Sequence, residues 1–185
     1  MMPQRWKKQR HICWRLCLRH QHGHQIYLSH VKQTTERIME SASSWEEYFM
    51  DLACKISERS KDPSTKVGCV VVTEDKVIAA TGYNGIPRGV EDKKERMERP
   101  AKYLWTAHAE ENAVAHAARV GARLKGGSAF VTHEPCSRCA RSLIQAGIVE
   151  VFVGTGTTKM PAEEFEVSRI MFEEAGVKVV RDDFA

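Results

Sequence analysis

The stretch SAFVTHEPCSRCARSLIQAGIVEVFV, residues 128–153, combines a strand, a helix and a second strand. Ser128 to Thr132 is predicted to be a strand, with the apolar residues Ala129 to Val131 at its centre. Cys136 to Ala146 is predicted to be a helix that Gly147 ends, and Val149 to Val153 is the next strand. This order predicts two parallel strands joined by a right-handed crossover.

The flanking segments extend the predicted sheet to five strands. Val67 to Val72 is β-branched and apolar, and Lys76 to Thr81 is its antiparallel partner across a turn at Glu74-Asp75. On the other side, a helix from Pro161 to Ala175 precedes a last strand, Val177 to Val180. The predicted fold class is therefore α/β, a three-layer α-β-α arrangement of one mixed five-stranded sheet with helices on both faces.

Two further helices precede this part of the sheet in the sequence. Ser44 to Glu47 forms a capping box, and apolar residues follow it at helical spacing: Trp45, Tyr48, Phe49, Leu52, Ala53 and Ile56. A second helix, rich in Ala, is predicted from about residue 107 to residue 120. Gly and Pro punctuate residues 82–105, so we expect a loop there, and a loop of that length is usually functional or mobile.

The length and composition suit one soluble domain and an additional segment outside it. The chain has 185 residues, of which 42% are hydrophobic and 28% charged. Its apolar runs fall short of the ~18–20 residues of a membrane span, so no membrane partner is expected. Cys54 and Cys69 lie within apolar patterns and are predicted to be buried thiols, whereas the spacing of Cys136 and Cys139 indicates metal or redox chemistry in a reducing, cytoplasmic compartment.

The net charge of +4 conceals an uneven distribution. Residues 1–40 hold eight Lys or Arg against two Glu, together with five of the eight His, so the remainder is mildly acidic. Residues 1–43 show no sustained helical or strand periodicity of apolar residues. They are predicted to be a basic, His-rich, disordered tail before a folded domain over residues 44–185. An organelle leader, an upstream start before Met39 and a second metal site stay open, the last among Cys13, Cys17, His20, His22 and His24.

Two short motifs carry the chemistry. His108-Ala109-Glu110 begins one predicted helix, and Pro135-Cys136-Ser137-Arg138-Cys139 begins another. One crossover separates them, so both helix starts are expected at the same end of the sheet. One imidazole and two thiolates suit zinc, and three protein ligands leave the fourth tetrahedral position open to water, as in catalytic sites.

The residue types then indicate hydrolysis. Bound zinc lowers the pKa of its water toward ~7, which makes hydroxide available at neutral pH. Glu110 lies two residues past His108 and can face the open position without binding the metal, which suits proton transfer to a ring nitrogen and a leaving amine. A redox C-x-x-C or a closed structural zinc site is the alternative, and it leaves Glu110 unexplained.

Through these motifs the chain resembles the cytidine/deoxycytidylate deaminase superfamily, which carries H-x-E and P-C-x-x-C. The resemblance covers residues 44–182 and is greatest to deoxycytidylate (dCMP) deaminases, through Asp62 to Gly68, Gly82 to Gly89 and His108 to Ala113. It implies hydrolytic deamination of dCMP to dUMP and ammonia in pyrimidine nucleotide metabolism. It also implies a homo-oligomer and a nucleotide triphosphate effector bound near Gly82 to Gly89.

The resemblance implies a role for eight residues. Zn2+ would be bound by His108, Cys136 and Cys139, with Glu110 as the catalytic residue. The implied substrate contacts are Asn84 at the sugar or base, Lys66 and Asn112 at the phosphate and ribose, and Arg88 at a phosphate or an effector.

Two departures from the dCMP pattern keep other substrates open. Glu134 precedes Pro135 where dCMP enzymes often carry an aromatic residue, and Glu111 replaces a frequent Leu. The alternatives are another cytosine or purine base, or a base in single-stranded nucleic acid, which the basic tail motivates and the mildly acidic body disfavours. A catalytically idle nucleotide-binding or zinc-stabilised protein is the third hypothesis.

Overall fold

The computed structural model describes residues 43–181, in a compact unit that begins at Ser43. The predicted tail therefore lies outside the described residues except for Ser43, and so does the conceivable second metal site. Among the helices of residues 43–181, none is long and apolar enough to cross a membrane.

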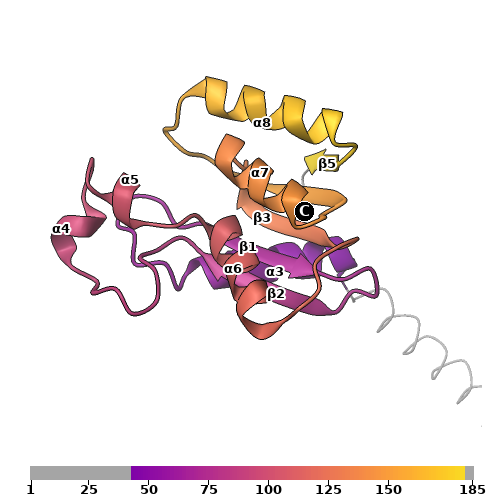
Figure 1. Ribbon diagram of the computed structural model, residues 1–185, viewed down its shortest axis with the longest axis horizontal. Helices are drawn as coiled ribbons and strands as arrows, with labels where there is room; N and C mark the ends of the chain where they lie inside the picture. The colour runs from indigo at the N-terminus through magenta and orange to yellow at the C-terminus, as the bar shows by residue number, and fades with distance from the viewer. Residues whose placement is uncertain (1–42, 182–185) are drawn as a thin grey trace, which may run out of the picture. The chain divides into compact units, whose positions relative to one another are not determined.

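The sheet has five strands in the order β2-β1-β3-β4-β5 (Figure 1). Their bounds are β1 Gly68–Val72, β2 Ile78–Tyr83, β3 Ser128–His133, β4 Glu150–Gly156 and β5 Lys178–Arg181. β1 pairs antiparallel with both β2 and β3, whereas β3, β4 and β5 run parallel. The predicted mixed sheet is confirmed, as is the crossover between β3 and β4.

Six helices accompany the sheet in the described part of the chain. They are α3 Trp45–Ser57, α4 Lys94–Met97, α5 Lys102–Trp105, α6 Ala109–Val120, α7 Ser137–Gln145 and α8 Ala162–Glu174. The capping box of α3 is formed, since Glu47 N–H donates to Ser44 Oγ and Ser44 N–H donates to Glu47. In Figure 1, α4 and α5 extend to one side of the sheet.

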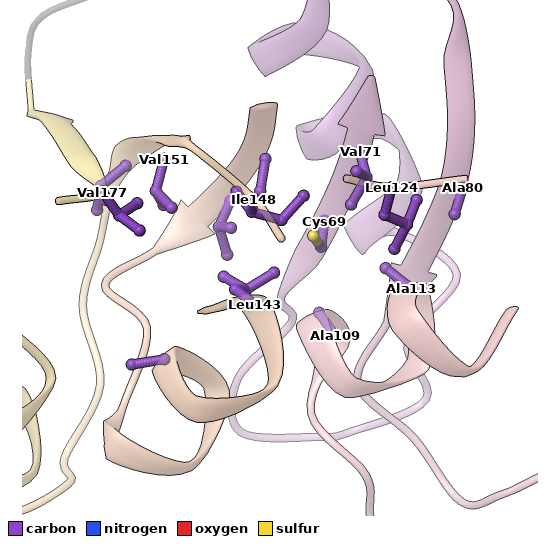
Figure 2. Close-up of a cluster of buried hydrophobic side chains, with 14 of the residues drawn as sticks. Cys69, Val71, Ala80, Ala109, Ala113, Leu124, Leu143, Ile148, Val151 and Val177 are labelled. Carbon is purple, nitrogen blue, oxygen red and sulfur yellow. The ribbon is translucent and has the colours of Figure 1, made fainter. Parts of the chain in front are cut away.

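Alternating side chains of the strands build two cores, one on each face of the sheet. On one face Val70, Val72 and Phe130 pack with Phe49 and Ala53 of α3. The other face packs against α6, α7 and α8, and Figure 2 shows residues of that cluster, among them Cys69, Val71, Ala109, Ala113, Leu143 and Val151. The three-layer prediction is therefore confirmed.

Three local predictions differ from the structure. β2 begins two residues later than predicted because Lys76, with φ of 61°, belongs to the turn, and Thr73 and Val77 close that turn by a hydrogen bond. The predicted loop over residues 82–105 contains the one-turn helices α4 and α5. Cys69 is buried as expected, but Cys54 is exposed because it lies outside the face of α3 that carries the buried residues Phe49, Met50 and Ala53.

Gly82 allows α6 to lie directly on β2. A Cβ at residue 82 would stand 2.1 Å from the Ala109 oxygen and 2.4 Å from the Ala113 nitrogen, both backbone atoms. We expect Gly82→Ala to lower the free energy of unfolding by about 1–3 kcal/mol, since the backbone cannot move aside without strain. Denaturant unfolding measures this. Gly85→Ala is the control, because its nearest neighbour is 3.7 Å away on the Tyr83 ring, and equal stability of the two variants would contradict the close packing.

Candidate active site

The two motifs meet at one edge of the sheet. β3 and β4 run parallel and end at this edge, β2 also ends there, and β1 begins there because it is antiparallel to its neighbours. His108 directly precedes α6 and Cys136 directly precedes α7, so both helices start at this edge. Open α/β sheets place their sites beyond the carboxyl ends of the parallel strands.

One imidazole and two sulfur atoms lie close enough to share a metal ion. His108 Nδ1 is 3.3 Å from Cys139 Sγ and 3.4 Å from Cys136 Sγ, and the two sulfur atoms are 3.7 Å apart. A tetrahedral zinc ion with bonds of about 2.0–2.3 Å separates its ligand atoms by about 3.5–3.8 Å. Both the donor set and its spacing therefore fit zinc, and within residues 43–181 this is the one such group of His, Cys, Asp or Glu side chains.

The two thiols differ in acidity. A hydrogen bond with Cys139, aided by one with His108, lowers the pKa of Cys136 to about 4 despite burial. The hydrogen bond with Cys136, together with burial, raises the pKa of Cys139 well above its ordinary value. Cys136 is therefore a thiolate at neutral pH, and a cation bound by both sulfur atoms displaces the proton of Cys139.

Glu110 is the buried acid of the site. It is the second residue of α6, its side chain lines the same cavity as His108 and Cys136, and the residue is 4% exposed. Burial raises the pKa of Glu110 to about 7, although hydrogen bonds with its own backbone N–H and with Cys139 oppose this shift. A carboxyl group that is half ionised near neutral pH can both accept and donate a proton.

Three cationic side chains line the same cavity. Arg99 and Lys102 come from the segment between β2 and α6, and Lys159 comes from the segment after β4. Lys102 is paired with Asp62, which also lines the cavity, so the positive charge that favours an anionic ligand comes from Arg99 and Lys159. Sequence reasoning missed all three, because they lie in segments without a motif and Lys and Arg are common at surfaces.

Of the four implied substrate contacts, Asn84 alone lines this cavity. Its Oδ1 accepts the N–H of Val67 at 2.8 Å and its Nδ2 donates to the Thr65 oxygen at 2.9 Å, so it joins the end of β2 to the start of β1. Lys66 is exposed beside this cavity. Arg88 and Asn112 line a second cavity, which is formed with residues of β2 and α6.

A buried ion pair fixes one wall of the cavity. Lys102 Nζ lies 2.6 Å from Asp62 Oδ2 and donates to Ser64 Oγ at 2.6 Å, and the two charged side chains are 7% and 3% exposed. Asp62 Oδ1 also accepts the N–H of Ser64 at 2.8 Å and of Thr65 at 3.2 Å. The pair thus attaches α5 to the segment before β1.

An α-β-α fold with one His, two Cys and a buried glutamate at two helix starts defines a class, the zinc-dependent hydrolases that remove amines from nucleobases. Comparison with known proteins agrees with this class. Residues 43–155 match the cytidine and deoxycytidylate deaminase zinc-binding region. The chain therefore belongs to the cytidine and deoxycytidylate deaminase family, and its cofactor is zinc.

Two relatives and one solved structure illustrate the similarity. An uncharacterized deaminase in the luxG 3′ region of Aliivibrio fischeri is 41% identical over 140 residues, covering 74% of this chain and 92% of the relative. The deoxycytidylate deaminase of Mus musculus is also 41% identical over 140 residues, covering 72% and 76%. The dCMP deaminase of the cyanophage S-TIM5, in complex with dCMP and dUMP, is 27% identical with a TM-score of 0.61, covering 74% and 96%.

Proposed function

We propose that this protein hydrolyses dCMP to dUMP and ammonia. The observation that carries the proposal is the buried carboxylate of Glu110, which lines the same cavity as His108 and Cys136 of the three-residue donor set completed by Cys139. Similarity to proteins named deoxycytidylate deaminase, and to a deaminase structure with dCMP and dUMP, supports the choice of substrate.

In this proposal His108, Cys136 and Cys139 hold zinc. When bound, zinc supplies Lewis acidity that makes water a nucleophile at neutral pH. Water adds to C4 of the cytosine ring while the Glu110 carboxylate accepts its proton and passes it to N3. Glu110 then accepts the second proton of the added water, from the C4 hydroxyl group, and transfers it to the departing amine, so that the uracil carbonyl and ammonia are formed.

Other residues of the cavity bind and orient the nucleotide. Asn84 faces the sugar or base, and its two hydrogen bonds to the backbone hold it still. Arg99 and Lys159, both exposed at the cavity, attract the 5′-phosphate, with Lys66 nearby as a further cation. Burial of the site excludes bulk water from Glu110.

The test compares dCMP with cytidine as substrates of the purified, zinc-loaded chain. Ammonia release from dCMP far above that from cytidine is expected, because cytidine lacks the phosphate. Activity on cytidine alone would overturn the assignment of dCMP. Activity on single-stranded nucleic acid that disappears when residues 1–40 are deleted would favour that substrate instead.

We also infer that a nucleotide triphosphate binds in the second cavity and regulates turnover. This cavity has a volume of about 270 Å³ and is lined by Tyr83, Arg88, Asn112, His116 and Arg119. Two guanidinium groups in one cavity suit a polyphosphate. dCTP and dTTP are the effectors to add, and Arg119→Ala is expected to weaken the response of the turnover rate. Turnover that neither triphosphate alters would contradict the inference.

The organisation of the chain is part of the proposal. We propose that residues 44–185 are the zinc-dependent deaminase domain, that residues 1–43 are a basic, His-rich tail outside that domain, and that the protein is a cytoplasmic homo-oligomer. The four cysteines of the described part, Cys54, Cys69, Cys136 and Cys139, are all free thiols, which suits a reducing compartment. Full dCMP turnover after deletion of residues 1–43 is expected, and sedimentation measures the oligomer.

A further inference from the structure

The two helix starts that carry the candidate zinc ligands are joined by an ion pair of their own. Glu111 follows Glu110 on α6, and Arg138 lies between Cys136 and Cys139. Arg138 Nε donates to Glu111 Oε1, and Arg138 Nη2 donates to Glu111 Oε2 at 3.0 Å. Such a two-point contact between a guanidinium and a carboxylate fixes relative orientation as well as distance.

The same carboxylate also holds the backbone of a ligand residue. Glu111 Oε2 accepts the N–H of His108 at 2.9 Å. One side chain therefore connects the residue that bears the imidazole to the residue that separates the two cysteines. The side chain of Glu111 is 19% exposed, so part of this connection is protected from water.

Arg138 lies in the first turn of α7, between Cys136 and Cys139. Its guanidinium therefore adds a positive charge to the helix start that carries both sulfur atoms, besides its link to α6.

We propose that Glu111 and Arg138 are a positioning pair that preorganises the zinc site and slows the release of zinc. The proposal rests on the zinc ligands assigned above. Without the pair, α6 and α7 are free to shift their first turns apart, and metal binding must then restrain them, which weakens affinity. Loss of a group that orients a metal ligand typically costs 10–100-fold in affinity.

Leu at position 111 would keep an apolar side chain of similar length to that of Glu111 but would carry no polar atom. A Leu cannot accept the His108 N–H or bind Arg138. Glu111→Leu therefore removes both contacts, whereas Glu111→Gln leaves an amide oxygen for His108 and removes the charge. Comparing the two variants separates the effect of the ion pair with Arg138 from the effect of the hydrogen bond to the His108 N–H.

The experiment measures how fast the full-length, zinc-loaded chain releases zinc to an excess of a chromogenic chelator. We expect release from Glu111→Leu and Arg138→Ala to be faster by about 10-fold. The double variant is expected to release zinc no faster than Glu111→Leu alone, since that single change already removes the contact that Arg138→Ala removes. Glu111→Gln is expected to fall between wild type and Glu111→Leu.

Glu150→Leu is the matched control. Glu150 pairs with Lys178 at 2.6 Å, and the side-chain exposures of 24% and 71% are similar to those of Glu111 and Arg138, but this pair joins β4 to β5 away from the metal ligands. Its release rate should equal that of wild type. Thermal unfolding of every variant shows whether faster zinc release merely reflects a less stable fold. Similar unfolding temperatures are expected, because exposed ion pairs contribute little to global stability.

Wild-type release rates in both Glu111→Leu and Arg138→Ala would overturn the positioning pair. Equal acceleration in Glu150→Leu would also overturn it, because the effect would then be general. A chain that binds no zinc would overturn the zinc site and the pair together. Bound zinc without turnover of dCMP would overturn only the proposed substrate, since zinc release is measured in the absence of any nucleotide.

Discussion

Glu110→Gln is expected to lower the turnover of dCMP by about 10²–10⁴-fold, the usual contribution of a positioned general acid–base group. The amide has nearly the shape of the carboxyl group but cannot accept a proton from water or deliver one to the departing amine. Glu110 is 4% exposed, so no bulk buffer can replace it. Ammonia release under saturating dCMP measures the loss.

The control for Glu110→Gln is a second carboxylate of the same cavity. Glu134 lines the cavity but is paired with Arg169 at 3.2 Å and with Arg181 at 2.9 Å. Glu134→Gln is expected to retain most of the turnover, because its carboxylate is held by these guanidinium groups. The zinc content of Glu110→Gln should stay at the wild-type level, and substantial turnover in that variant would contradict the proton-transfer role.

Lys102→Met is expected to destabilise the fold by about 3–5 kcal/mol, the usual cost of leaving one member of a buried ion pair without its partner. The change leaves Asp62 buried without its opposite charge, at a site where both side chains are at least nine-tenths hidden. Denaturant unfolding at neutral pH measures the change. Adding Asp62→Asn should recover part of the loss, because the uncompensated charge is then removed.

The loss of folding stability in Lys102→Met should depend on pH. Burial alone would raise the pKa of Asp62, but hydrogen bonds from Lys102, Ser64 and Thr65 outweigh it and hold that pKa below its ordinary value of 3.8. A depressed carboxyl pKa contributes stability that is complete above the unfolded value and is lost as the pH falls through the folded value. The difference between wild type and Lys102→Met should therefore narrow below about pH 4, and a difference that grows in acid would contradict the ion pair.

The sequence alone predicts the sheet well because its strands carry a local signal. Residues 129–131 and 151–153 are short apolar runs at the centres of two strands, and a helix with a glycine at its end separates them. The start of β2 was less predictable, because the left-handed conformation of Lys76 has no signature in a residue of that type. The segments of α4 and α5 show no helical periodicity of apolar residues. They are held by contacts between residues far apart in the sequence, such as Lys102 and Asp62.

The candidate site divides in the same way. His108, Glu110, Cys136 and Cys139 stand in two short motifs, and the topology that brings these motifs together follows from one predicted crossover. Arg99, Lys102 and Lys159 reach the cavity from irregular segments whose path depends on tertiary packing. Their contribution could not be read from the spacing of residues along the chain.

The most direct measurement follows the conversion of dCMP by the zinc-loaded protein, with dUMP and ammonia quantified in the same reaction. We predict that the two products appear in equal amounts, that a chelator which removes zinc abolishes both, and that restored zinc returns them. Zinc-loaded protein that leaves dCMP unchanged would contradict the proposed function.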